Sequence, residues 1–215
     1  MDTNVSKKLH EFFTNFPLKR FKRGQILIYG GDSPPGIYFI QSGEVRQYDI
    51  ARNGDEMVVN VYNPPSLFPM SWAVNQAPNE YFYETTMDTV VSIAPVEDCL
   101  VFFKQNPDVV YALLSRSYEN TDTLLRRMKH LMKGTAQSRA ILELLIACKC
   151  FEAQRNNACT VLVSENELAA RTGLTRETIS RELRQLQNRQ LITMGRKQII
   201  INDIASLEAL LSQKL

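Results

Sequence analysis

The chain has 215 residues, of which 44% are hydrophobic and 22% are charged, and its formal net charge is +2. This length is enough for two modest domains with a core each, and we expect two domains joined by a helix. No apolar run approaches the ~20 residues that cross a bilayer, and the polar start, Met1 to His10, lacks the pattern of a signal peptide. We therefore expect a cytoplasmic protein without a membrane partner.

Cysteine and histidine usage argues against a metal-dependent enzyme. The four cysteines form no CxxC pair, and none stands at zinc-ligand spacing from the two histidines, His10 and His130. The segment 22–95 contains no histidine, and the chain has no Gly-x-Ser-x-Gly nucleophile motif. We expect reduced thiols in the protein core, no catalytic residue and no metal site.

The first half of the chain has the pattern of a β domain. Runs of aromatic and β-branched residues alternate with glycine, proline and Asn-Gly turns, and the predicted strands are residues 25–29, 36–40, 44–50, 56–62 and 89–94. Strands this short and this regularly spaced are typical of a sandwich or barrel.

A long helix is predicted next, starting with Asn106 as N-cap and Pro107 in the first helical position. Apolar and small residues then recur at steps of four and three, the a and d positions of a coiled coil. The predicted dimer interface consists of these positions: Val110, Leu114, Ser117, Thr121, Leu124, Met128 and Leu131. The alternative is that the stripe packs on its own β domain, although Leu113, Leu125 and Met132 offer a second apolar edge for that contact.

The C-terminal part predicts two short helices joined by a glycine turn. Ser164 to Glu167 matches a capping box, Gly173 ends the first helix, and Thr175 is a second N-cap. The buried face of the second helix would carry Ile179, Leu183 and Leu186. A break at Gly134 marks a hinge before this part. Helix, glycine turn and helix is the arrangement that places a second helix in the major groove of DNA.

Candidate DNA contacts cluster around that second helix, residues 175–188. Its first exposed turns carry the predicted base contacts Arg176, Glu177, Ser180 and Arg181. The predicted backbone contacts are three hydroxyls and a basic turn between strands 191–194 and 198–201, namely Ser164, Thr175, Thr178, Arg196 and Lys197. An Arg-Glu-x-x-x-Arg helix face is also common on solvated surfaces, but the wing that follows favours DNA.

The motifs together resemble the Crp/Fnr superfamily of bacterial transcription regulators over essentially the whole chain. The resemblance rests on residues 30–32 and 38–45 and, more specifically, on residues 174–181. It implies an α+β fold: an N-terminal double-stranded β-roll similar to cyclic-nucleotide-binding domains, a long dimerisation helix and a C-terminal winged helix-turn-helix. The corresponding boundaries are 1–105, 106–134 and 135–215.

The resemblance also implies a homodimer that binds a palindromic DNA site and contacts RNA polymerase. Glu177 and Arg181 would then be the main base contacts, with Arg176 assisting. Ser180 is similar to the oxygen-sensing branch and Arg176 to the cyclic-AMP receptor branch, so the half-site, TGTGA-like or TTGAT-like, stays open. Activation is the expected mode; repression, DNA binding without an effector, and a regulatory module that binds no DNA are the alternatives.

The β domain departs from the sensors of both branches. The segment 64–72 lacks the Gly-Glu and Arg-Ser pairs that hold cyclic AMP, and no arginine lies between Arg52 and Arg116. No cysteine precedes Cys99 to ligate an iron-sulfur cluster. We expect neither cofactor. The candidate pocket for an unknown apolar effector is aromatic: Phe68, Met70, Trp72, Tyr81, Phe82 and Tyr83. The alternative, that these side chains simply fill the domain, remains open.

Overall fold

The computed structural model describes residues 3–150, 157–195 and 198–213. The chain forms two compact units, Met1–Glu119 and Asn120–Leu215. The division falls within one long helix, α4 (Pro107–Lys133), which spans the residues where the long helix was predicted. The expected domain limits at residues 105 and 135 lie at the two ends of α4, whereas the compact units divide inside it.

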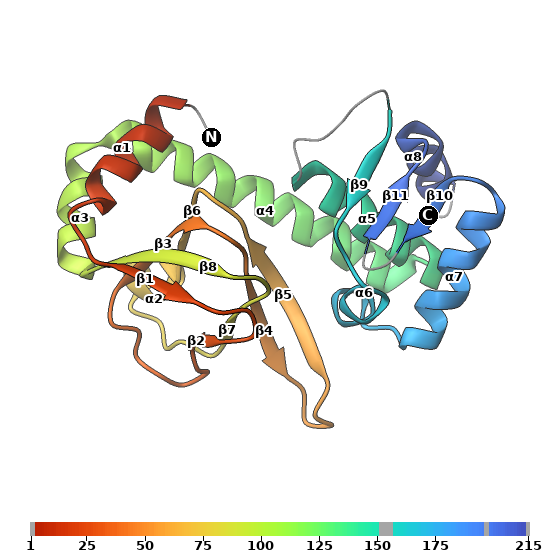
Figure 1. Cartoon of the computed structure of the whole chain (residues 1–215), viewed down its shortest axis with the longest axis horizontal. Coiled ribbons are helices and arrows are strands. Elements are labelled where there is room, and N and C mark those ends of the chain that lie inside the picture. Colours follow the sequence, from red (N-terminus) through yellow and green to blue (C-terminus); the bar gives the residue numbers. More distant parts are fainter. Residues whose placement is uncertain (1–2, 151–156, 196–197, 214–215) are drawn as a thin grey trace. The chain divides into compact units, whose positions relative to one another are not determined.

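Two four-stranded antiparallel sheets build the N-terminal unit (Figure 1), where the strand pattern predicts a sandwich or barrel. One sheet has the order β1-β8-β3-β6 and consists of Leu18–Phe21, Thr89–Ala94, Ile37–Ser42 and Ser66–Phe68. The other has the order β2-β7-β4-β5 and consists of Ile26–Ile28, Phe82–Thr85, Val45–Ile50 and Glu56–Tyr62. Strands β1, β6 and β7 are additional to the predicted ones, because three or four residues are too few to display an alternating pattern.

Strand β3 separates two apolar cores of this unit. Ile37 and Phe39 belong to a core shared with α1 (Thr3–Phe13) and α3 (Val96–Gln105), whereas Tyr38 and Ile40 belong to a core shared with the second sheet. Successive strand residues point to opposite faces, so a run that is apolar throughout is buried on both sides. The first sheet is therefore covered by helices on one face and by a sheet on the other.

The helical side of this unit also receives the start of α4. Val109 is buried in the same core as α1 and α3, and Leu113 packs against it. The ring of Phe13 stacks on Phe39 with 4.8 Å between centroids, and Phe12 stacks on Phe102 at 4.2 Å. Aromatic packing thus attaches the helices to the sheet, which the strand pattern does not reveal.

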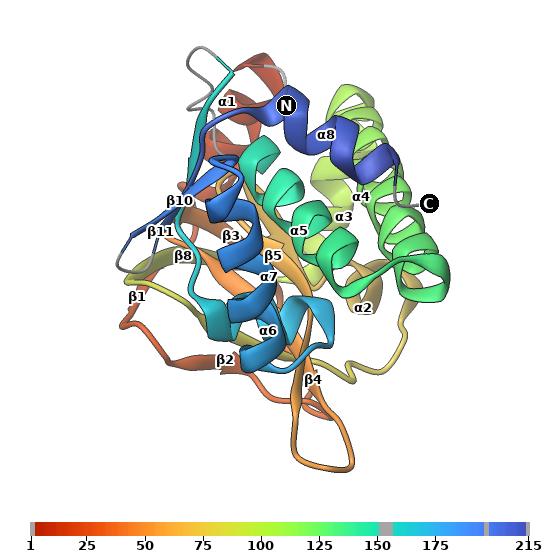
Figure 2. The same cartoon turned by 90° about the vertical axis from the view of Figure 1, so that its right-hand side faces the viewer.

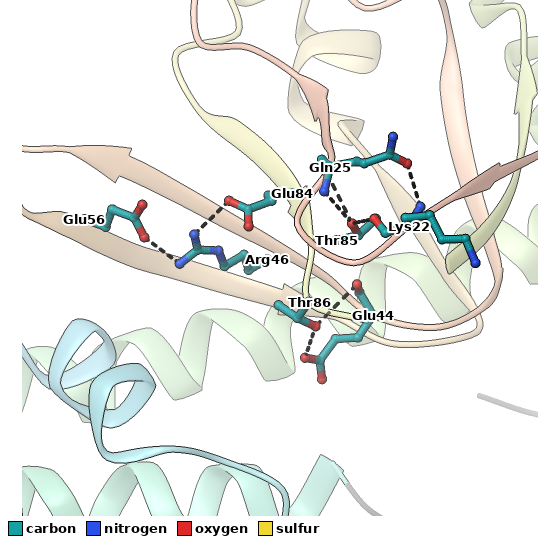
Figure 3. A network of polar contacts seen from close by, with 8 residues as sticks. All are labelled: Lys22, Gln25, Glu44, Arg46, Glu56, Glu84, Thr85 and Thr86. Atoms are coloured by element: carbon teal, nitrogen blue, oxygen red, sulfur yellow. Dashed lines mark hydrogen bonds and ion pairs between the residues drawn. The ribbon is translucent and has the colours of Figure 1, made fainter. Parts of the chain in front are cut away.

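A polar network ties together three strands of the second sheet (Figure 3). Arg46 on β4 donates to Glu56 on β5 at 2.6 Å and to Glu84 on β7 at 2.7 Å. Its guanidinium also lies 4.5 Å from the centroid of the Tyr48 ring. The charge of Arg46 is therefore neutralised on the outer face of the sheet.

The C-terminal unit contains the two predicted helices joined by a glycine turn and the two predicted strands after them, together with further elements (Figure 2). Its elements are α5 (Ala136–Cys150), β9 (Cys159–Val161), α6 (Glu165–Thr172), α7 (Arg176–Asn188), β10 (Ile192–Gly195), β11 (Gln198–Ile201) and α8 (Ile204–Ser212). The strands form one antiparallel sheet in the order β10-β11-β9. A single apolar core includes residues of α5, α6, α7, α8 and all three strands, so the position of α7 is determined by every other element of the unit.

The end of α4 is fastened to α5 around Gly134. Arg127 donates through Nε and Nη2 to the two carboxylate oxygens of Glu143, at 2.6 and 2.9 Å, and Glu143 is only 3% exposed. A Cβ on Gly134 would collide with the Ser138 hydroxyl and with the carbonyl of His130. Close packing therefore accounts for glycine at the predicted hinge position.

Candidate DNA-binding interface

Helix α6 begins with the capping box that the sequence predicts. The hydroxyl of Ser164 accepts a hydrogen bond from the Glu167 amide at 3.2 Å, and the Ser164 amide donates to the Glu167 carboxylate at 2.7 Å. Gly173 ends the helix with a φ of +64°, a left-handed conformation that glycine adopts without strain. Because its hydroxyl also donates to Glu167 at 2.9 Å, Ser164 would have to exchange that bond to bind a phosphate.

Helix α7 starts at the second predicted cap and is anchored by its apolar face. The Thr175 hydroxyl accepts from the Thr178 amide at 3.2 Å. Ile179, Leu183 and Leu186 are all completely buried. Since these three residues define one side of the helix, their burial directs the opposite, polar side of the helix outward.

The four predicted base contacts lie together on that outward face. They line an open hollow with further residues of α6 and α7: Glu165, Arg176, Glu177, Ser180, Arg181, Arg184, Gln185 and Asn188. Arg184, Gln185 and Asn188 were not predicted. Arg184 and Gln185 stand four residues beyond Ser180 and Arg181, and Asn188 stands four residues beyond Arg184, so all three continue the same helix face. Glu165 comes from α6, and no local sequence pattern connects it with α7.

The two arginines of this hollow each contact a carboxylate. Nε of Arg176 lies 3.5 Å from Oε2 of Glu165, and Nε of Arg181 lies 3.6 Å from Oε1 of Glu182. About two thirds of each arginine side chain is exposed. Their guanidinium groups are thus held at the surface and remain accessible to a ligand.

The predicted wing follows α7 as two paired strands. Ile192 pairs with Ile201, and Gly195 pairs with Gln198 at the end of the ladder. The predicted backbone contacts Arg196 and Lys197 come between these strands in the sequence and lie outside the described residues.

Both units of the chain match known protein families. Residues 18–106 match the model of the cyclic nucleotide-binding domain, and residues 138–210 match that of the Crp-like helix-turn-helix domain. The global nitrogen regulator of Nostoc sp. strain PCC 7120 is 25% identical over 192 residues, which cover 86% of this chain and 85% of the relative. The chain belongs to the Crp/Fnr superfamily.

Two further relatives agree with this assignment. The cyclic AMP receptor protein of Thermus thermophilus is 24% identical over 196 residues, 90% of this chain and 87% of that protein. A crystal structure of a CRP/FNR-family transcriptional regulator from the same species has the same fold, with a TM-score of 0.73 at 20% identity, and the match covers 93% of this chain and 100% of that one. This Crp/Fnr protein is therefore a DNA-binding transcription regulator, and the expected α+β fold is confirmed.

The apolar stripe of α4 in this Crp/Fnr regulator is largely exposed. Val110, Leu114, Leu124, Met128 and Leu131 are between 42% and 55% exposed. The predicted second edge is found only in part: Leu113 packs on the N-terminal core, whereas Leu125 and Met132 are more than half exposed. At Val110 and Leu114, the two stripe residues named above that lie in the N-terminal unit, this exposure argues against the alternative that the stripe packs on its own β domain.

The six residues of the predicted effector pocket are divided among different environments. Phe68 and Tyr83 are buried in the core between the sheets and stack at 5.1 Å, and Tyr81 packs against that core. Met70 and Trp72 pack against the helix-covered core instead.

The prediction that Phe82 lines the same pocket as Tyr83 is wrong, because the two residues lie on opposite faces of β7. Its ring stacks on Tyr48 at 5.3 Å, on the side of the sheet where Arg46 pairs with Glu84. Adjacent residues of a strand cannot line the same pocket. The six residues therefore do not form one continuous lining.

Arg116 is a residue of the N-terminal unit that the sequence patterns did not single out. It extends from α4 and donates to the Pro65 carbonyl at 2.5 Å and to the Ser66 hydroxyl at 2.9 Å. Nearby, the Tyr62 hydroxyl donates to Gln47 at 2.9 Å, and burial raises the pKa of Tyr62 and of Tyr83. The segment 64–72 thus has an arginine beside it, supplied from 50 residues further along the chain.

No group of three or more His, Cys, Asp and Glu side chains is placed to bind a metal ion within residues 3–150, 157–195 and 198–213. Burial raises the pKa of the Cys99 thiol to about 12, so Cys99 is un-ionised and unreactive at neutral pH. Among the described helices, none is long and apolar enough to cross a membrane.

Proposed function

We propose that this regulator is a homodimeric activator that binds a palindromic operator through residues 175–188. One observation carries the proposal: Arg176, Glu177, Ser180 and Arg181 share the outward face of α7 while the opposite face is anchored in the core. A capped, rigidly anchored helix with a polar outer face has the shape and chemistry of a major-groove recognition helix.

The chemistry of these side chains suits base edges. Arg176 and Arg181 offer paired donors for guanine N7 and O6, Glu177 accepts from the cytosine amino group, and Ser180 adapts to either partner. Thr175, Thr178 and Ser164 supply hydroxyls for phosphates, and Arg196 and Lys197 would reach the backbone from the wing. We leave the half-site open between the TGTGA-like and TTGAT-like forms.

The exposed stripe of α4 supports a parallel pairing of two α4 helices as the dimer contact. Half-exposed leucine, methionine and valine at a and d spacing are the side chains that a partner helix buries in a coiled coil. A symmetric dimer presents two copies of α7, which is what a palindromic operator requires.

We extend this proposal to the cellular role. A regulator of this superfamily acts by binding, so we propose no enzymatic activity, and we place the protein in the cytoplasm, where it meets chromosomal DNA. Activation would involve contact with RNA polymerase, and repression by occlusion is the alternative outcome of binding the same site.

A second candidate is that DNA binding needs no effector at the aromatic positions. Phe68 is completely buried, Tyr83 is nearly so, and Phe68 stacks on both Tyr38 and Tyr83. Rings that contact one another on both faces already fill their surroundings. This packing favours side chains that fill the domain over a pocket for an apolar effector. Addition of cell extract or candidate ligands that changes operator affinity would contradict it.

Selection from random duplexes tests base recognition. Wild-type protein should enrich an inverted repeat with half-sites about one helical turn apart. Arg181→Ala should lose about 1–3 kcal/mol of specific binding at each half-site, because the paired donors are removed. Arg189→Ala, which removes an exposed arginine outside the hollow, should keep the motif. Failure of wild type to enrich any motif, both purified and in cell extract, would contradict the proposed function.

Sedimentation tests the dimer. Leu124→Lys places a charge in the stripe and should yield monomers with weakened operator binding, since a lysine at an a or d position of a dimer is strongly unfavourable. Leu125→Lys is the matched control, because Leu125 is similarly exposed but lies off the stripe. If both variants dissociate, or neither does, the dimer contact is elsewhere.

A further inference from the structure

The two arginines proposed to contact bases have the same kind of partner. Each directs Nε toward a carboxylate of its own domain, Arg176 toward Glu165 and Arg181 toward Glu182, at 3.5 and 3.6 Å. Because these contacts are made through Nε, they do not require the terminal amino groups of the two guanidinium groups. Those groups supply the donors that pair with guanine N7 and O6.

Glu182 occupies a position where α7 faces the core. It is 8% exposed and stands beside Leu183 on the buried side of the helix. A buried carboxylate is costly unless it is hydrogen-bonded. Nε2 of Gln137, which is 4% exposed on α5, donates to Glu182 at 3.3 Å and to Gln185 at 2.9 Å. Glu182 is therefore held from α5 and presents its other oxygen to Arg181.

Glu165 is the carboxylate partner of Arg176, as Glu182 is of Arg181. It stands in the first turn of α6, directly after the cap at Ser164, and about one quarter of its side chain is exposed. The capping box fixes the start of α6, so the position of Glu165 relative to α7 is determined by the packing of the two helices. A carboxylate here also repels phosphates from the hollow.

We propose that Glu165 and Glu182 are positioning residues that orient Arg176 and Arg181 for base contact, an inference that rests on the proposed function. Orienting an arginine before binding reduces the conformational entropy that the complex must lose. The contacts are long and partly solvated, so they are weak enough to be rearranged when DNA arrives. The same negative charges disfavour sequence-independent attraction to phosphates, so both effects raise the ratio of specific to non-specific binding.

The test compares Glu165→Gln and Glu182→Gln with wild type on the selected operator and on a scrambled duplex, over a range of salt concentrations. Each variant should bind the scrambled duplex more tightly. Its specificity ratio should fall by about 2- to 5-fold per half-site, the range expected for weak ion pairs, hence by about 4- to 25-fold for a two-fold site. Glu208→Gln removes the same charge from the exposed face of α8 and should leave the ratio unchanged.

Base preference separates positioning from charge. Glu165→Gln should relax discrimination at the base pair that Arg176→Ala also relaxes, and Glu182→Gln at the base pair of Arg181→Ala. In the Arg176→Ala background, Glu165→Gln should then lower the ratio by less than it does in the wild type, because only the effect of its charge on phosphates remains. Because Glu182→Gln changes a buried group, the thermal unfolding of this variant is measured as well. If Glu182→Gln unfolds, the variant of the less buried Glu165 decides the result.

Three outcomes would overturn the inference. The first is that the specificity ratios of Glu165→Gln and Glu182→Gln equal that of the wild type. The second is that these ratios fall no further than the ratio of Glu208→Gln. The third is that Glu165→Gln lowers the ratio as much in the Arg176→Ala background as in the wild type. If the wild-type protein binds the operator and the scrambled duplex equally, the proposed function is overturned together with the inference. If the wild-type protein and the variants all prefer the operator to the same extent, the inference alone is overturned.

Discussion

The two units of the molecule use their polar and aromatic residues in opposite ways. In the N-terminal unit these residues contact one another. Arg46 is neutralised by Glu56 and Glu84, and Phe68 stacks on Tyr38 and on Tyr83. In the C-terminal unit the apolar residues form one core, and Arg176, Glu177 and Arg181 of α7 face outward. Function is therefore visible on the surface of the second unit, whereas in the first unit the same residue types mainly stabilise the fold.

The largest expected effect tests the inner aromatic core of the N-terminal unit. Phe68→Ala should lower the free energy of unfolding by about 3–5 kcal/mol, because it leaves a cavity among stacked rings. Phe82→Ala is the matched control on the outer face and should cost clearly less, since Phe82 is only partly buried. Chemical denaturation followed by fluorescence of Trp72, the single tryptophan, reports on this unit. Equal losses for the two variants would show that the two faces are not as different as we describe.

A smaller effect is expected in the C-terminal unit. Arg127→Ala removes both hydrogen bonds to buried Glu143 and should cost about 2–3 kcal/mol, below the ~3–5 kcal/mol of fully buried pairs because Arg127 is 21% exposed. Arg126→Ala, an exposed neighbour on the same helix, should be nearly neutral. Unfolding followed by far-ultraviolet circular dichroism should show this loss of stability. The unfolding transition followed by Trp72 fluorescence, which reports on the N-terminal unit, should shift less. If the two transitions move together by the full amount, the units unfold as one.

The smallest effect concerns pH and His130 in the C-terminal unit. Burial, followed by the nearby charges of Lys129 and Arg126, lowers the pKa of His130 below its ordinary value of 6.5. The unfolded chain therefore binds a proton that the folded state disfavours, so stability is retained above about pH 6.5 and declines as the pH falls through that value. Thermal unfolding at about pH 7.5 and about pH 5.5, on either side of that value, should show a larger drop for wild type than for His130→Gln. The same drop in both proteins would assign the acid sensitivity to other groups.

Sequence patterns predicted the DNA-binding half better than the sensor half, and the residues explain why. Caps at Ser164 and Thr175, and the end at Gly173, are determined by interactions within a few residues, so they are visible locally. The positions of β1, β6 and β7 depend on partners far along the chain. Arg116 is the clearest example, because it lies next to Ser66 only through the folding of α4 against the β domain.

The sequence by itself determined the helix-turn-helix, the strand-rich first half, the long helix with its apolar stripe and the superfamily, since hydrophobic period and capping chemistry are local properties. Only the tertiary structure decided that Phe82 and Tyr83 serve different faces, that Leu125 and Met132 remain exposed, and that Glu165 and Glu182 accompany Arg176 and Arg181. These relations join residues of separate elements, and packing rather than local propensity determines which elements meet.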